Sequence, residues 1–257
     1  MGKITIIGLG CGDERYVTRE AWGILQQAQS PVWLRTEAHP VVAALPCVWQ
    51  SFDQVYRDSA EFETVYAHII DTIIALGQQQ DVIYCVPGDP HVGESTTFGI
   101  LQQAEEADIA VHVVRGLSFY EPIVAAIGLD GMDGVQIYDA ITIAQHLYAP
   151  INPDAPLILG QVYSKMLASE LKLALMAVYA AEYEVQLIHG AGTGEESAEI
   201  LPLYQIDRSE NIGNLTTLYV PARESIGSIG QFADTVAILR SPNGCPWDRE
   251  QTPQSLR

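Results

Sequence analysis

The sequence predicts an α/β protein with two subdomains, each built on a mixed or mostly parallel sheet flanked by helices. Through residue 114, short apolar runs alternate with amphipathic stretches, a pattern typical of parallel strands joined by covering helices. Beyond residue 115 the expected strands follow one another with fewer helices between them, which favours a mixed sheet. A chain of 257 residues is long enough for two domains of about 110 residues each.

The first subdomain is expected to begin with a strand at 4–9, an apolar run that ends in glycines. Thr18 then precedes apolar residues at helical spacing, so it should cap a helix that extends to about Ala28. A longer amphipathic helix is expected over 62–76, with Gly77 at its end. The remaining expected elements are strands at 31–35, 81–86 and 109–114 and a helix near 97–104.

The second subdomain is expected to start with a helix near 119–127 and to contain a proline-rich turn at 150–156. Its expected strands are 135–140, 157–162, 184–189, 201–206 and 215–220, and its main helix is 165–179. An amphipathic helix at 227–240 follows, and 243–257 is polar and without periodicity. We place the subdomains at 1–114 and 115–222 and a terminal segment at 223–257.

The charge balance excludes some classes of partner. The chain carries 32 acidic and 13 basic residues, and Arg115 is the only Lys or Arg between Asp58 and Ser164. Binding to nucleic acid draws on clustered Lys and Arg, so we expect no nucleic-acid partner and a solvated, acidic surface. The apolar runs are too short for a membrane helix and no leader precedes the first strand, so we expect a cytoplasmic protein without membrane contact.

The cysteines and the acidic clusters predict neither a disulfide framework nor a metal site. The four cysteines form no CxxC pair, which favours reduced thiols over disulfides or structural zinc. Residues 195–199 match E-E-x-x-E, a magnesium motif of hydrolases, but Pro202 interrupts any helix there, so we interpret the match as coincidence. Gly190–Gly194 resembles a phosphate loop, yet no lysine follows it.

Two glycine-rich loops carry the strongest functional signal. Residues 8–13 follow the first strand and 87–97 follow the strand at 81–86, so both loops could line one crevice at the carboxyl ends of parallel strands. The first loop could bind a dinucleotide, but Asp13 stands where that fingerprint requires glycine; a tight turn at positive φ is the structural alternative. In the second, prolines on both sides of Gly88 and Asp89 suit a stiff pocket or an ordinary strand end.

These loops resemble a known family. Residues 4–18, ITIIGLGCGDERYVT, look like the opening V-G-x-G-P-G-D-x-x-x-L-T of the tetrapyrrole (corrin/porphyrin) methylases. VPGDPHVGEST resembles the G-D-P loop of that family, and RGLSF at 115–119 resembles its P-G-[IV]-[ST]-[SA] segment, so the resemblance spans about 3–222. The final residues NGCPWDREQTPQSLR are similar to the start of a MazG nucleoside-triphosphate pyrophosphohydrolase domain, which implies that 223–257 is a linker helix and the beginning of a fused MazG domain.

The resemblance implies S-adenosylmethionine (SAM) bound in a cleft between two α/β domains, commonly in a homodimer. The residues that it places near SAM in the first three motifs are Cys11, Pro87, Gly88, Asp89, Val92, Ser118 and Phe119. A looser match adds Gln161, Val162, Gly190, Ala191, Leu215 and Thr216. Asp89 can bond a ribose hydroxyl or close its own turn.

Methyl transfer is an in-line displacement that requires alignment and exclusion of water, so no catalytic constellation or metal is expected. Asp13 and Tyr163 could orient an acceptor or take its proton; a turn cap and a core tyrosine are the alternatives. Among the six histidines only His91 lies in a motif, where an exposed loop residue is the alternative to a functional one.

Two departures from the family pattern affect the expected activity. Cys11 and Arg115 replace prolines, and a chain with a net charge of −19 offers few partners for a polycarboxylate tetrapyrrole. We therefore predict a SAM-dependent methyltransferase-like domain with an unidentified small-molecule acceptor. The alternative is a non-catalytic SAM-binding or dimerisation module that regulates or positions MazG, and a third reading is a nucleotide-binding oxidoreductase.

Overall fold

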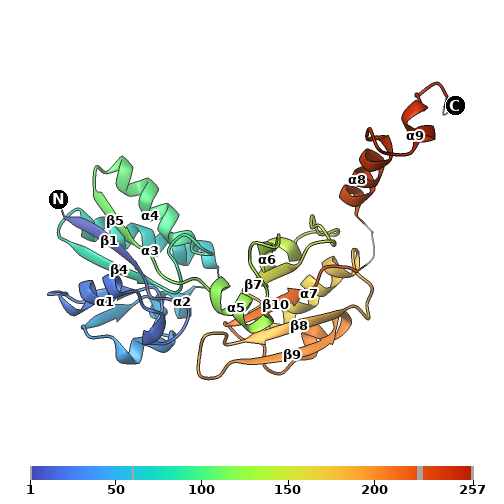
Figure 1. The fold of residues 1–257 in the computed structure, drawn as a ribbon. Coiled ribbons are helices and arrows are strands. Elements are labelled where there is room, and N and C mark those ends of the chain that lie inside the picture. The colour runs from blue at the N-terminus through green and yellow to red at the C-terminus, as the bar shows by residue number, and fades with distance from the viewer. Residues whose placement is uncertain (1, 60, 225–227, 256–257) are drawn as a thin grey trace. The chain divides into compact units, whose positions relative to one another are not determined.

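The computed structural model describes residues 2–59, 61–224 and 228–255 (Figure 1). Its internal contacts divide the chain into two compact units. The first unit comprises Met1–Leu129 and Gly190–Ser197, and the second comprises Asp130–His189 and Ala198–Arg257. The subdomain boundaries expected from the sequence, after 114 and 222, stay predictions.

The first unit contains a parallel five-stranded sheet in the order β3-β2-β4-β1-β5. The strands are β1 (Lys3–Gly8), β2 (Val32–Leu34), β3 (Trp49–Ser51), β4 (Val82–Val86) and β5 (Ala110–Val114). Its helices are α1 (Arg19–Gln26), α2 (Asp53–Asp58), α3 (Phe62–Gly77), α4 (Ser95–Glu106) and α5 (Tyr120–Ile127), with 3₁₀ turns η1 (Glu14–Tyr16) and η2 (Pro40–Ala44). The parallel sheet that the first half predicts is confirmed.

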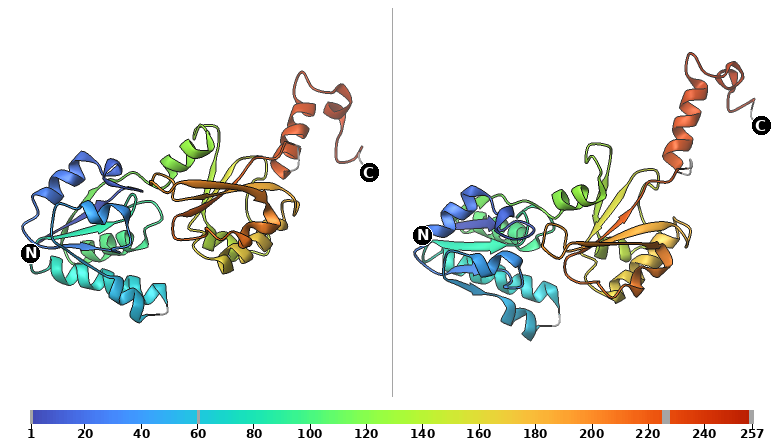
Figure 2. Two further views of the ribbon diagram at one scale, coloured as in Figure 1. Left: turned by 90° about the horizontal axis from the view of Figure 1, so that it is seen from below. Right: turned by 60° about the horizontal axis from the view of Figure 1, so that its bottom comes forward.

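Helices cover both faces of this sheet (Figure 2). Ile6 and Ile7 are adjacent in β1, so their side chains point to opposite faces, and each is fully buried in a different core cluster. The cluster around Ile6 includes Ile69 and Ile73 of α3. A strand buried on both faces explains why three of the four residues at 4–7 are isoleucines.

The second unit contains a mixed sheet in the order β6-β7-β10-β8-β9, as the second half predicts. Strand β6 is parallel to β7, whereas β10 is antiparallel to both β7 and β8. The strands are β6 (Gln136–Asp139), β7 (Leu157–Gly160), β8 (Glu184–His189), β9 (Ser197–Pro202) and β10 (Thr216–Val220). The helices α6 (Ala140–Ala144) and α7 (Lys165–Met176) pack against each other and share one core cluster with the sheet.

The strand expected at 201–206 is wrong. Ser197–Pro202 forms β9, and Leu203–Arg208 forms the 3₁₀ helix η3. Leu203 and Ile206 are both fully buried in the same core, which residues three apart in a strand cannot achieve because they lie on opposite faces. Tertiary packing therefore selects a helical turn for this apolar segment.

Several short elements were not predicted from the sequence patterns. Strand β3 and helices α2 and α6 are three to six residues long, too short for a repeated periodicity. Residues 243–257 were expected to be unpatterned, but Pro246–Glu250 forms the one-turn helix α9.

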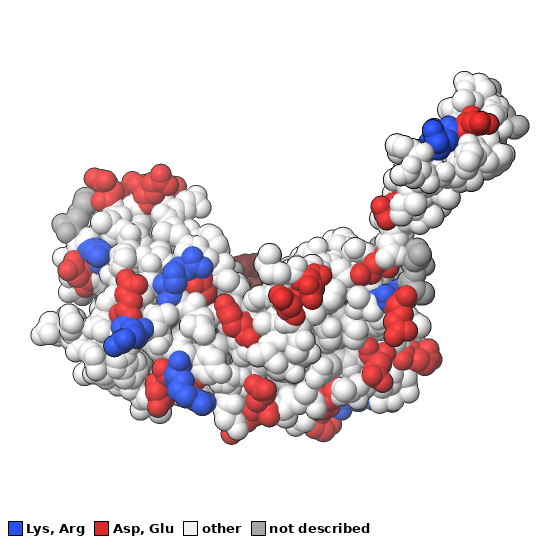
Figure 3. Space-filling model, in the orientation of Figure 1, with Lys and Arg blue, Asp and Glu red and all other residues white. Residues whose placement is uncertain are grey.

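The expected helix at 227–240 is described from Ile229 to Arg240 as α8; its expected start at Gly227 lies outside the described residues. Ser228 caps α8 by accepting a hydrogen bond from the amide of Gln231. None of the described helices is long and apolar enough to cross a membrane. Figure 3 shows acidic and basic side chains interspersed on the face that it draws, without one dominant basic patch.

Candidate functional site

Three loops meet at the carboxyl edge of the first sheet, where β4, β1 and β5 are neighbours. Gly10 and Gly88 form a two-way backbone pair: the Gly10 amide donates to the Gly88 carbonyl at 3.2 Å, and the Gly88 amide donates to the Gly10 carbonyl at 2.7 Å. A Cβ atom on Gly8 would lie 2.5 Å from the Gly88 oxygen, and one on Gly116 would lie 2.2 Å from that oxygen. The glycines are thus required for backbones to touch, and all three sequence motifs share one site.

Asp89 joins the loop after β4 to the loop after β5. One carboxylate oxygen accepts a hydrogen bond from the His91 amide at 2.8 Å, and the other accepts from Arg115 Nε at 2.7 Å and the Gly116 amide at 3.2 Å. Burial raises the pKa of Asp89, but the hydrogen bonds from Arg115 and the two amides outweigh it and lower that pKa below its ordinary value. These contacts assign Asp89 to the closure of its turn; contact with a ribose stays a prediction.

Arg115, one of the departures from the family pattern, is therefore the charged partner of Asp89. Its guanidinium is largely exposed, so the ion pair is screened by water, while the carboxylate beneath it is buried. Replacement of a proline by Arg115 gives the carboxylate an extra hydrogen-bond donor.

His39 belongs to the site although no motif contains it. The imidazole is buried, and its Nε2 lies 2.9 Å from the Gly10 carbonyl, while Nδ1 accepts from the Val41 amide at 3.4 Å. Burial lowers the pKa of His39, and the hydrogen bond to Gly10 opposes that shift only in part. The neutral tautomer with hydrogen on Nε2 satisfies both contacts, so His39 positions the first glycine loop.

Cys11 is a buried thiol. Burial is the main cause that raises its pKa to about 11, and the nearby charge of Glu121 adds to the shift. The side chain therefore stays protonated at neutral pH and acts as a small apolar group. Glu121 in turn accepts a hydrogen bond from Ser118 Oγ at 2.7 Å, and Ser118 accepts one from the Tyr120 amide, which secures the start of α5 beside half-buried Phe119.

The second loop presents an exposed surface next to Asp89. Pro87 is half-buried and Val92 is 37% exposed. The His91 ring, half-exposed at its side chain, packs edge-on against the exposed Phe98. His91 is thus a loop residue whose imidazole Nδ1 is 3.7 Å from Asp89.

The segment 190–197 belongs to the first unit and packs against the first glycine loop. A Cβ on Gly12 would lie 2.3 Å from the Gly192 carbonyl oxygen. Gly190 adopts φ +58 and its carbonyl accepts hydrogen bonds from Thr193, so a tight turn holds Gly190 and Ala191 near the first loop.

The other four expected cofactor residues lie together in the second unit. Gln161 follows β7 with φ +63, an unfavourable conformation for a residue with a side chain, and its carbonyl accepts from the Tyr163 amide at 2.9 Å. The Val162 amide donates to the Thr216 carbonyl, and Leu215 before it is 48% exposed. The loop after β7 is thereby tied to the start of β10.

A buried histidine supports Thr216. The Thr216 hydroxyl accepts from the Gly213 amide at 2.9 Å and lies 3.0 Å from His189 Nδ1. His189 Nε2 lies 3.3 Å from a Glu199 carboxylate oxygen. Burial lowers the pKa of His189, and the adjacent Glu199 carboxylate opposes the shift.

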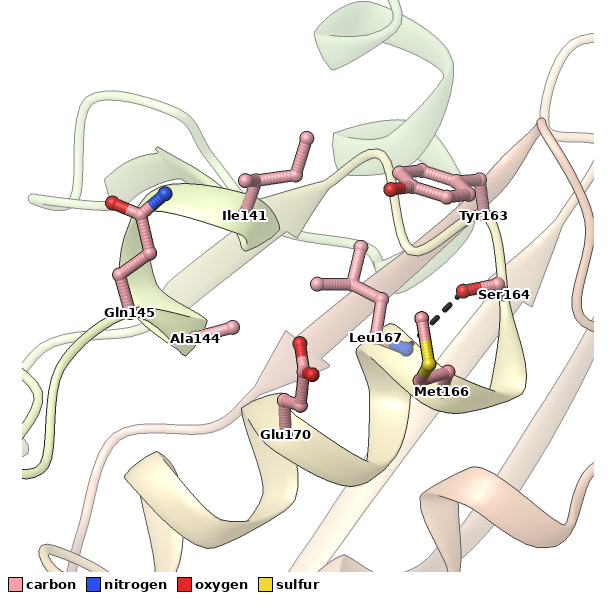
Figure 4. Close-up of a pocket in the computed structure, with 8 residues that line it drawn as sticks. All are labelled: Ile141, Ala144, Gln145, Tyr163, Ser164, Met166, Leu167 and Glu170. Carbon is pink, nitrogen blue, oxygen red and sulfur yellow. Dashed lines mark hydrogen bonds between the residues drawn. The ribbon is translucent and has the colours of Figure 1, made fainter. Parts of the chain in front are cut away.

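The two candidate acceptor residues have different environments. Asp13 caps η1 by accepting from the Arg15 amide, and it forms an exposed ion pair with the Arg15 guanidinium. This is the turn-cap alternative. Tyr163 is 37% exposed and lines a pocket of about 350 Å³ in the second unit, so its interpretation as a core tyrosine is wrong (Figure 4).

A buried ion pair between Arg35 and Glu94 lies beside the second loop and was not expected from the sequence. Arg35 also donates to the hydroxyls of Tyr56 and Tyr66, each at 3.0 Å. Glu94 caps α4 through the Thr96 amide at 3.0 Å. The pair holds the end of the second loop. Its members are 59 positions apart, so no local sequence pattern could predict it.

Among the described residues, no group of three or more His, Cys, Asp or Glu side chains could hold a metal ion. Glu196 accepts from the Gly192 amide, and Glu199 lies on β9 with Ser209 and Asn211 as partners. These glutamates occupy a loop and a strand, not one face of a helix.

Comparison with known proteins identifies relatives along most of the chain. Residues 3–207 match the protein family of tetrapyrrole (corrin/porphyrin) methylases. The chain is 35% identical over 263 residues to the uncharacterised protein YabN of Bacillus subtilis (strain 168), covering 100% of this chain and 53% of YabN. The chain thus spans about half the length of that relative.

Solved structures share the fold at low identity. Diphthine synthase superposes with a TM-score of 0.64 at 18% identity, covering 86% of this chain and 90% of that protein. Uroporphyrin-III C-methyltransferase from Thermus thermophilus, in complex with S-adenosylhomocysteine, gives 0.58 at 16% identity, covering 86% and 92%. With the match over 3–207 and the three loops joined at one sheet edge, the chain belongs to the tetrapyrrole (corrin/porphyrin) methylase family.

Proposed function

We propose that this protein is a SAM-dependent methyltransferase acting on a small-molecule acceptor. The observation that carries the proposal is the backbone junction of the loops after β4, β1 and β5, at the strand ends where α/β sheets bind ligands. Family membership supports SAM as the cofactor, as does the S-adenosylhomocysteine complex of the Thermus thermophilus enzyme.

The described residues fit SAM chemically. Gly88 has φ +68, and a Cβ added there would find no atom nearer than 3.9 Å, so open space lies over its backbone. Val92 and Leu215 offer exposed apolar side chains for the adenine or the methionine chain. The strained Gln161 is a second sign, because unfavourable backbone conformations concentrate at ligand sites.

The groups that would hold SAM are backbone atoms and small side chains. In the first unit they belong to Cys11, Pro87, Gly88, Asp89, Val92, Ser118, Phe119, Gly190 and Ala191. In the second they belong to Gln161, Val162, Leu215 and Thr216. When bound, SAM supplies a methyl group already activated on sulfur.

The protein's contribution is to align the acceptor and exclude water. Asp89 and His39 hold the first two loops in place through Arg115, Gly116 and Gly10. The protonated Cys11 thiol is a poor nucleophile at neutral pH, so it does not compete with the acceptor for a methyl group.

A second candidate is a non-catalytic SAM-binding or dimerisation module that regulates or positions MazG. Cys11 and Arg115, which change the loops nearest the expected cofactor, favour it. The MazG fusion is itself part of our proposal, and two observations support it: the resemblance of 243–257 to the start of MazG, and the greater length of YabN. We further propose a cytoplasmic homodimer with no nucleic-acid or membrane partner, in keeping with the acidic composition.

Calorimetry with SAM and S-adenosylhomocysteine tests the proposal. We expect micromolar binding, or about 8 kcal/mol, and at least a tenfold weaker affinity in Gly88→Val, whose side chain would enter the space above the loop. Binding without turnover of SAM across a panel of acceptors would favour the regulatory module. Failure of both ligands to bind would overturn both candidates.

A further inference from the structure

A pocket lies between α6 and α7 of the second unit and includes Tyr163 of the loop after β7 (Figure 4). Its volume of about 350 Å³ is at the lower end of the range for small-molecule sites. The residues that line it are Ile141, Ala144, Gln145, Tyr163, Ser164, Met166, Leu167 and Glu170. All of them belong to the second unit, so one unit forms the whole pocket.

The lining suits an apolar ligand with one polar group. Ile141, Met166 and Leu167 supply hydrocarbon and a thioether, and the Tyr163 ring borders them (Figure 4). The side chain of Glu170 extends from α7 toward the same space and provides the one charged group of the lining. A carboxylate beside an apolar wall favours a neutral or cationic ligand and repels an anionic one.

No lysine of α7 neutralises Glu170. Lys165 Nζ lies 2.7 Å from Glu210, and Lys172 Nζ lies 2.5 Å from Asp207. Both lysines stand at positions of α7 that do not share a face with Glu170, since they are five and two residues away. Neither lysine of α7 therefore pairs with Glu170, the charged residue of the lining.

Tyr163 connects the pocket with the expected cofactor residues. Its side chain lines the pocket, while its amide donates to the carbonyl of Gln161, the residue at φ +63. The next hydrogen bond in the loop runs from the Val162 amide to Thr216. An acceptor in the pocket would thus contact the same short loop that is expected to hold SAM.

We propose that this pocket binds the methyl acceptor and that the acceptor is a small molecule with an apolar body and a neutral or cationic nitrogen. The proposal rests on the proposed function, and it names the substrate class of that activity. It also agrees with a chain of net charge −19, which disfavours polycarboxylates.

Two probes of similar size and opposite charge test the pocket: 2-phenylethylamine and 3-phenylpropionate. The whole chain is labelled with ¹³C at Ile, Leu and Met methyl groups, so that Ile141, Met166 and Leu167 report on the pocket and Met132, 91% exposed elsewhere, serves as control. We expect the amine to shift the pocket methyl signals with a Kd at least fivefold below that of the carboxylate. Glu170→Gln should reduce this preference to less than twofold.

Glu184→Gln is the matched control variant, because Glu184 is exposed on β8 and does not line the pocket. It should keep the preference for the amine. Equal binding of the two probes to the wild type, or a preference that survives in Glu170→Gln, would overturn the proposal.

A third arm separates this proposal from the proposed function. If the pocket holds the acceptor, saturating S-adenosylhomocysteine should change the Kd of the amine at least threefold, because both ligands would contact the loop at residues 161–163. S-adenosylhomocysteine that binds in calorimetry but leaves that Kd unchanged would overturn the acceptor site alone. Absence of S-adenosylhomocysteine binding would overturn the proposed function and, with it, the assignment of the pocket to an acceptor.

Discussion

The two sheets bring together the loops of the proposed cofactor site in different ways. In the first unit β4, β1 and β5 are parallel, so their carboxyl ends meet at one edge and three loops contact one another through glycine backbones. In the second unit β10 runs antiparallel to β7, so the start of β10 lies beside the end of β7. A parallel sheet thus gathers loops that follow strands, whereas a mixed sheet also recruits residues that precede one.

The two regions also differ in what holds the loops. Asp89 is the centre in the first unit and accepts hydrogen bonds from Arg115 and two backbone amides. In the second unit the neutral hydroxyl of Thr216 is the centre, supported by His189, and the neighbouring Gln161 has an unfavourable φ. The loops of the first region are held together by backbone contacts and by the charge of Asp89. The second region instead contains a residue with an unfavourable φ, Gln161, next to a pocket.

The largest effect is expected where backbones touch. Gly116→Ala places a Cβ 2.2 Å from the Gly88 carbonyl oxygen, so the loops after β4 and β5 must separate. We expect a loss of about 3 kcal/mol in unfolding free energy, the upper end for overpacking, together with loss of SAM binding. Urea unfolding and calorimetry measure both.

Gly23→Ala is the control for that substitution. Gly23 lies within α1 and a Cβ there has no neighbour within 4 Å, so helix propensity should stabilise the protein by up to about 1 kcal/mol. If Gly116→Ala and the wild type have the same urea midpoint, the backbones of these loops are not in the close contact described for the first unit.

Asp89→Asn tests whether the negative charge of Asp89 helps to hold the loops of the first region together. The buried amide cannot accept all three hydrogen bonds, and we expect a loss of about 1–3 kcal/mol near neutral pH. Because the pKa of Asp89 is lowered in the folded state, its stabilisation is present above the ordinary carboxyl pKa and is lost as pH falls through the lowered value. Urea midpoints measured from pH 7 to pH 3 should therefore fall less steeply in the variant.

Asp13→Asn provides the comparison, since Asp13 is an exposed carboxylate that also bonds an arginine. Its effect on the midpoint should be smaller than that of Asp89→Asn at every pH. A wild-type and an Asp89→Asn curve of the same slope would exclude the lowered pKa.

His39→Ala probes the imidazole that holds Gly10. Loss of the hydrogen bond to the Gly10 carbonyl should lower stability by about 1–2 kcal/mol at pH 8. The pKa of His39 is lowered on folding, so its contribution is complete above the ordinary histidine pKa and declines as pH falls from there through the folded value.

The difference in unfolding free energy between the wild type and His39→Ala should thus become smaller as pH falls from 8 to 5. Thermal or urea unfolding measures it. His68→Ala, at an exposed position of α3, is the control for removal of a histidine that does not bond Gly10. A constant difference across this range would contradict a buried neutral imidazole.

The smallest effect is expected in the second region. Gln161→Gly relieves the unfavourable φ of +63, which glycine adopts readily, and we expect a change in stability of about 1 kcal/mol or less, in the favourable direction. SAM affinity should nevertheless fall, because a flexible residue no longer presents the loop in one conformation. Gln27→Gly, at a negative φ after α1, should destabilise instead. If Gln161→Gly destabilises the protein, the φ of Gln161 is not a source of backbone strain, and the contrast drawn between the two regions is wrong.

Much of the fold follows from local patterns. Strands β1 and β4 are rich in apolar residues because helices cover both sheet faces, and Thr18 caps α1 as its spacing predicts. The segment 201–206 was misassigned because its apolar residues match a strand until the core requires Leu203 and Ile206 on one side.

The candidate site was predictable where a loop directly follows a strand, as at Gly8 and Gly88. It was not predictable where the partner is distant in sequence. His39 bonds Gly10 across 29 positions and Arg35 pairs with Glu94 across 59, and neither pair has a periodicity that could reveal it.

The sequence by itself determined the fold class, the strand ends that carry the glycine loops and the family, because these depend on residue types at short spacing. Only the tertiary structure decided that Asp89 serves Arg115 and Gly116, and that Tyr163 borders a pocket instead of the core. Hydrogen-bond partners and cavities arise when strands that are far apart in sequence become neighbours, and short-range patterns carry no record of that pairing.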